Sequence, residues 1–124
     1  MKEEKIQIAI SKYIKNQYPN IIFTAESSGV RLPMGLAVKV KKQRSKHKHL
    51  DLIILEPRCE YHGLILELKK SRDEVFKKNG EMRDVEHIQK QWETIQLFRS
   101  KGYFSGWGLG FDETKKVIDN YMKL

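Results

Sequence analysis

The segment Leu64-Ile65-Leu66-Glu67-Leu68-Lys69 decides the fold, because it is an apolar strand whose far end carries an acid and a lysine. Strand side chains alternate, so residues two apart share a side. The three leucines are therefore expected to face one layer of the protein, and Ile65, Glu67 and Lys69 the other. The chain has two further Glu-x-Lys triplets, but both lie on predicted helices, where residues two apart do not share a face.

A second strand precedes this one, since Asp51 opens the apolar run 52–55. The runs 50–55 and 64–69 predict a hairpin joined by residues 56–63. With its turn centred near residue 60, Asp51 is expected opposite Lys69 and diagonal to Glu67. Diagonal neighbours lie roughly 7–8 Å apart, close enough for two carboxylates to hold one ion. Mg²⁺ prefers such a sparse carboxylate set with waters and phosphate oxygens. The pattern favours a metal-dependent nuclease; the alternative is a surface salt bridge.

Length and charge narrow the class of protein. At 124 residues the chain is expected to form a single domain, 1–124. Lys and Arg number 24 against 16 Asp and Glu, a net charge of +8 that favours a polyanionic partner over a merely solvated basic surface. Cys59 is the only cysteine, which excludes an internal disulfide and fits a reducing cytosol. No apolar stretch approaches the roughly 20 residues of a membrane span. We therefore expect a cytoplasmic protein with no membrane partner.

Periodicity predicts the remaining elements. Isoleucines spaced by four predict an amphipathic helix over 3–18, ended by Pro19. Branched and aromatic residues predict a strand over 21–25, and an apolar stripe predicts a helix over 84–101.

Three segments between and after these elements complete the pattern. Residues 37–49 are ambiguous between a short helix and a basic loop, and 71–82 is polar and expected to be a flexible loop. Residues 103–111 are expected to form a strand, followed by a helix with Asp112 as its N-cap. Helices separated by strands in this order imply an α/β fold with a mixed sheet covered on both faces. No glycine-rich phosphate loop is present, so no nucleotide cofactor is expected.

Several short motifs together resemble the VRR-NUC family of the PD-(D/E)XK nuclease superfamily, in its short stand-alone form found in phages. The matching segments run over nearly the whole chain: Glu3-Glu4-Lys5-Ile6-Gln7, Gly29-Val30-Arg31, Tyr61-His62-Gly63-Leu64, Glu67-Leu68-Lys69, His87-x-x-x-Gln91, Gly102-Tyr103, Gly110-Phe111-Asp112-Glu113 and Ile118-Asp119-Asn120-Tyr121. The chain departs from the family pattern before the aspartate, where Leu50 replaces a proline and Lys48-His49 replaces the preceding glycine. We expect a shifted loop there and a retained site.

The resemblance implies a restriction-endonuclease-like αβββαβ core, with a central mixed sheet flanked by helices on both faces. It assigns the metal acids to Asp51 and Glu67, and the catalytic lysine to Lys69. The accessory helix acid maps to Glu3, with Glu4 as the alternative, and Gln91 matches a glutamine close to the active site. It further implies a Mg²⁺- or Mn²⁺-dependent DNA endonuclease, acting as a homodimer on branched DNA such as Holliday junctions.

A run of cations lies next to Asp51 and predicts a clamp for the DNA backbone, the alternative being a mobile basic loop. Its members are Lys39, Lys41, Lys42, Arg44, Lys46 and Lys48. Arg31 is predicted either to contact the scissile phosphate or to pair with an acid. Two rival functions stay open: a non-catalytic DNA-binding protein on a nuclease fold, and a basic accessory subunit of a phage DNA-processing complex.

Overall fold

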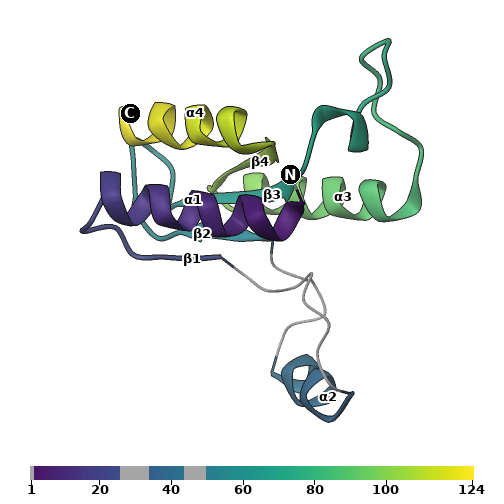
Figure 1. Ribbon diagram of the computed structural model, residues 1–124, viewed down its shortest axis with the longest axis horizontal. Coiled ribbons are helices and arrows are strands. Elements are labelled where there is room, and N and C mark those ends of the chain that lie inside the picture. The colour runs from purple at the N-terminus through teal and green to yellow at the C-terminus, as the bar shows by residue number, and fades with distance from the viewer. Residues whose placement is uncertain (1, 26–33, 44–49) are drawn as a thin grey trace.

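Four strands form one mixed sheet in the order β1-β2-β3-β4 in the computed structural model, which describes residues 2–25, 34–43 and 50–124 (Figure 1). The strands are β1 (Phe23–Ala25), β2 (Leu52–Ile54), β3 (Leu64–Lys69) and β4 (Phe104–Leu109). β1 and β3 both pair with β2 in antiparallel fashion, whereas β3 and β4 are parallel. The parallel pair is possible because the connection between β3 and β4 contains a helix.

The helices cover both faces of this sheet, as expected. They are α1 (Glu3–Gln17), α2 (Met34–Lys42), α3 (Glu86–Ser100) and α4 (Phe111–Met122). α1 and α4 pack against the face that carries the three leucines of β3, and α3 packs against the opposite face through Ile95 and Ile65. α2, inserted between β1 and β2, is set away from the sheet (Figure 1). The αβββαβ core and its mixed sheet are thus confirmed.

The apolar stripe of α1 explains why that helix forms and where it sits. Ile6, Ile10 and Ile14 are at most 1% exposed against the sheet, and each such burial contributes about 1.5–3 kcal/mol. The helix is also tied to α4, because the hydroxyls of Tyr13 and Tyr18 both donate to Oδ1 of Asp119, at 2.6 and 2.7 Å. This contact fixes the first helix across the leucine face.

β4 approaches its neighbours closely at Gly108. A Cβ atom there would lie 2.6 Å from Oγ1 of Thr114 and 2.7 Å from a methyl group of Leu68. In contrast, a Cβ atom at Gly106 in the same strand would meet only the end of the Arg99 side chain, at 3.7 Å. Glycine at 108 therefore sets how tightly α4 packs on the sheet.

The register of the β2–β3 hairpin differs from the prediction. Leu52 pairs with Leu66 and Ile54 with Leu64, so the ladder extended by one residue places Asp51 opposite Glu67 rather than opposite Lys69. The turn is displaced because it contains an Arg58–Tyr61 bridge with Cys59 in the left-handed region, at φ 53°. The displacement is two residues along one strand, so Asp51 keeps the sheet face that Glu67 and Lys69 share.

Two further expectations were wrong. Residues 71–82 are an ordered segment with a 3₁₀ turn, η1 (Arg72–Glu74), and a Phe76–Met82 bridge, rather than a flexible loop. They are ordered because Val75, which is 0% exposed, packs with apolar side chains of α3 and β4. The last helix is N-capped by Gly110, and Asp112 lies inside its first turn.

Within the described ranges, no helix has the length and apolar character needed to cross a lipid bilayer.

Candidate metal centre

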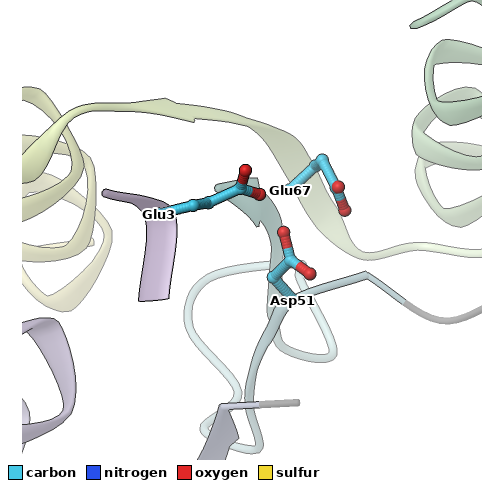
Figure 2. A group of neighbouring side chains, drawn as sticks. All are labelled: Glu3, Asp51 and Glu67. Atoms are coloured by element: carbon cyan, nitrogen blue, oxygen red, sulfur yellow. The ribbon is translucent and has the colours of Figure 1, made fainter. Parts of the chain in front are cut away.

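Three carboxylates from three different segments meet at one end of the sheet (Figure 2). Glu3 comes from the first turn of α1, Asp51 immediately precedes β2, and Glu67 lies in β3. One oxygen from each lies within 4.8 Å of the oxygens of the other two. Asp51 and Glu67 are buried, and Glu3 is half-buried. Glu4, the alternative for the helix acid, is exposed and stands outside this cluster.

Backbone and side-chain hydrogen bonds orient two of these acids. The backbone N–H of Leu68 donates to Oδ2 of Asp51 at 3.0 Å, so the aspartate is held against β3. Nε2 of Gln91, on α3, donates to Oε1 of Glu67 at 2.7 Å. The structure therefore brings Gln91 to the acids, as the resemblance implies. Lys69 lies two residues beyond Glu67 and is only 6% exposed.

Burial and the neighbouring carboxylates raise the pKa of two of these acids, Glu67 and Glu3. Burial, together with the charge and hydrogen bond of Asp51, raises the pKa of Glu67 from 4.5 to about 9, while Lys69 acts in the opposite direction and Glu3 adds to the rise. Burial is also the largest cause that raises the pKa of Glu3; Lys69 opposes it and Asp51 adds to it. Acids whose pKa is raised in this way favour the binding of a proton or of another cation, because either one offsets their negative charge.

The donor set suits a hard divalent cation. Carboxylate oxygens are the ligands that Mg²⁺ and Mn²⁺ prefer, whereas imidazole and thiolate, which favour zinc, are absent from this cluster of described residues. Oxygens bound to one Mg²⁺ at about 2.1 Å lie about 3 to 4 Å apart. Small side-chain rotations would bring the three oxygens to that spacing. The residues present thus fit a Mg²⁺ or Mn²⁺ ion.

Sequence reasoning missed Glu74 at this site. Glu74 accepts a hydrogen bond from the backbone N–H of Lys70 at 3.2 Å, and its charge contributes to the raised pKa of Glu3. It lies in η1, inside the segment expected to be a flexible loop. No spacing in the sequence signals this proximity, since it depends on the turn that the chain makes directly after β3.

Only part of the predicted basic clamp falls within the described residues. Lys39, Lys41 and Lys42 lie on α2 and are exposed. Arg31, Arg44, Lys46 and Lys48 lie outside the described residues.

The arrangement defines a class of protein: a mixed α/β sheet with buried acids and a lysine at one end is the restriction-endonuclease-like nuclease fold. A search of solved structures finds one described as "VRR_NUC domain protein", with a TM-score of 0.67 and 27% sequence identity, which covers 100% of this chain and 90% of that one. The structural comparison thus confirms the resemblance to the VRR-NUC family over the whole chain. No family model and no curated protein matches the sequence.

Proposed function

We propose that the protein is a Mg²⁺- or Mn²⁺-dependent DNA endonuclease that hydrolyses phosphodiester bonds. The convergence of Glu3, Asp51 and Glu67 within 4.8 Å carries the proposal, because three carboxylates this close, two of them buried, can share one cation. The bound ion would acidify a water molecule and offset negative charge on the reacting phosphate. The family likeness supports the same chemistry, and the net charge of +8 supports a polyanionic substrate.

Each of the neighbouring residues has a role in this proposal. Asp51 and Glu67 hold the ion directly, and Glu3 completes the set from α1. Gln91 fixes the Glu67 carboxylate by donating to it, so that one oxygen stays directed at the ion. Lys69 orients the attacking water or steadies the scissile phosphate, where its charge opposes the developing negative charge.

The substrate is proposed to be branched DNA, such as a four-way junction, and the active form a homodimer. A symmetric junction requires two cuts related by a two-fold axis, which a C2 dimer supplies. The exposed lysines of α2 would contact the DNA backbone on one side of the site. Arg31, Arg44, Lys46 and Lys48 are proposed to add to that contact.

The test is incubation of the purified protein with linear, flapped and four-way DNA, with and without Mg²⁺ or Mn²⁺. Cleavage that requires the ion, and that Asp51→Ala, Glu67→Ala and Lys69→Ala each abolish while DNA binding persists, supports the proposal. DNA binding without cleavage under either ion would favour the non-catalytic DNA-binding protein. Absence of both from the isolated chain, with activity only in a defined complex, would favour the accessory subunit.

A further inference from the structure

The segment that follows β3 forms a small hairpin held by several hydrogen bonds. The 76–82 hairpin (residues Phe76–Met82) is closed by its Phe76–Met82 bridge and by the Lys77 N–H, which donates to the Glu81 carbonyl at 2.8 Å. Gly80, at φ 89°, allows the turn, and the Glu81 N–H donates to Oδ1 of Asn79 at 3.0 Å. These bonds give the tip one defined shape.

The base of the hairpin is anchored to the rest of the fold by its own apolar cluster. Val75 is 0% exposed and packs with Ile88 of α3 and Leu109 of β4, and Phe76 and Met82 join them. The guanidinium of Arg72 lies over the ring of Phe76, 4.7 Å from its centre. The hairpin therefore keeps a fixed position relative to β3, and so relative to Glu67 and Lys69.

The tip of the hairpin presents cations. Lys77 and Lys78 are exposed, and among the described residues neither has an ion-pair partner. In Figure 1 the hairpin projects on one side of the start of α1, where Glu3 lies, and α2 with its exposed lysines lies on the other. The lysines of α2 and of the hairpin thus lie on two sides of the acidic cluster in this view.

Lysines on both sides of the acidic cluster would help a nucleic-acid duplex to bind at this site. DNA carries one negative charge per roughly 1.7 Å of helix axis, so the three acids repel any backbone that approaches them. Cations on one side alone would hold only one arm of the duplex. A second contact beyond the acids would fix the strand on both sides of the scissile phosphate, which is what precise positioning requires.

We propose that the 76–82 hairpin is a second contact for the nucleic-acid backbone, in which Lys77 and Lys78 bind phosphates on the side of the metal centre opposite α2. This inference rests on the proposed function, because it takes a duplex as the ligand of the same site. The contact is to phosphates, so it holds the substrate without reading its sequence.

The test compares two double variants with equal charge loss. Lys77→Ala/Lys78→Ala removes the proposed contact. Lys15→Ala/Lys123→Ala removes two exposed lysines at the ends of α1 and α4 that lie furthest from Glu3, and serves as the matched control. All four lysines are exposed, so both proteins should fold, and thermal unfolding verifies this. Binding to a labelled duplex of about 30 base pairs is measured by fluorescence anisotropy in EDTA, between about 50 and 200 mM salt.

The hairpin variant is expected to lose at least about fivefold in affinity near 0.1 M salt, and its slope of log affinity against log salt should fall in magnitude by about 1 to 2. The control should stay within about twofold of wild type, with an unchanged slope. Equal losses in both variants, no loss in the hairpin variant, or a wild type that does not bind duplex even at the lowest salt would overturn the inference.

Cleavage by the wild type, measured in parallel, separates the two proposals. A protein that cleaves DNA but whose hairpin variant binds like the control retains its proposed function and loses this inference. A protein that binds through the hairpin but cleaves nothing with either ion retains the inference and loses the proposed function.

Discussion

Replacing Glu67 with glutamine should make the metal-free protein more stable at neutral pH. The pKa of Glu67 is raised to about 9, chiefly by burial and by Asp51, so the folded protein holds a proton there that the unfolded chain, near 4.5, releases. An acid whose folded pKa is raised costs stability as pH rises from 4.5 towards 9. Glutamine carries no such cost, and it retains an oxygen that accepts from Gln91.

The size of the effect follows from the pH interval. Each pH unit above 4.5 costs about 1.4 kcal/mol until the folded pKa is reached, so at pH 7 the wild type loses up to about 3.5 kcal/mol. This is a ceiling, because Glu3 lies in the same cluster with a raised pKa and can take up part of the proton affinity. Well below pH 4.5 both states are protonated, and the difference between the two proteins should vanish.

Urea unfolding in EDTA at about pH 5 and about pH 7 measures the difference. Glu93→Gln makes the same chemical change at an exposed position of α3 and should shift stability by less than about 0.5 kcal/mol at either pH. Excess Mg²⁺ should stabilise the wild type more than Glu67→Gln, since a ligand stabilises the state that binds it. This account would be refuted if Glu67→Gln were less stable than wild type in EDTA at pH 7. It would also be refuted if the variant exceeded the wild type in free energy of unfolding by the same amount at both pH values.

Two packing predictions concern the leucine face. Asp119→Ala should lower the free energy of unfolding by about 2–3 kcal/mol, because both tyrosine hydroxyls that bridge α1 to α4 lose a charged acceptor; urea unfolding tests this, and a loss below about 0.5 kcal/mol would contradict it. Gly108→Ala should cost about 1–3 kcal/mol from overpacking, whereas Gly106→Ala in the same strand should cost clearly less. Equal thermal shifts for the two alanine variants would show that the close approach at 108 does not limit packing.

The sequence predicts most of the layered architecture because each layer has its own period. Isoleucines four apart can bury only one side of a helix, and alternation in 64–69 sends the leucines and Glu67 to opposite faces. Both expectations hold in the structure. The same alternation survives the error in hairpin register, since a two-residue displacement preserves the face. That is why Asp51 and Glu67 meet even though their pairing was mispredicted.

What the sequence does not predict depends on contacts between distant segments. Residues 71–82 are polar overall, and only the presence of α3 and β4 beside Val75 makes that segment ordered. The N-cap of α4 is Gly110. Asp112 is of a residue type that is common at N-caps, and for that reason the sequence predicts the start of the helix two residues too late. Glu3 was assigned by family resemblance alone, because no local pattern places the first turn of α1 beside a strand about fifty residues later.

The acidic cluster lies at the end of the sheet where the β2–β3 ladder stops. Asp51 lies just before β2, and Glu67 lies in β3 one residue beyond the last pair of the two strands, Leu52 with Leu66. Hydrogen bonds from Leu68 and Gln91 there go to carboxylates and not to a neighbouring strand. Ending the β2–β3 ladder at this point forgoes a little sheet stability but places two buried carboxylates side by side, as a cation site requires. The apolar packing of α1, α3 and α4 holds these strands in place, so the core supplies the rigidity that such a site needs.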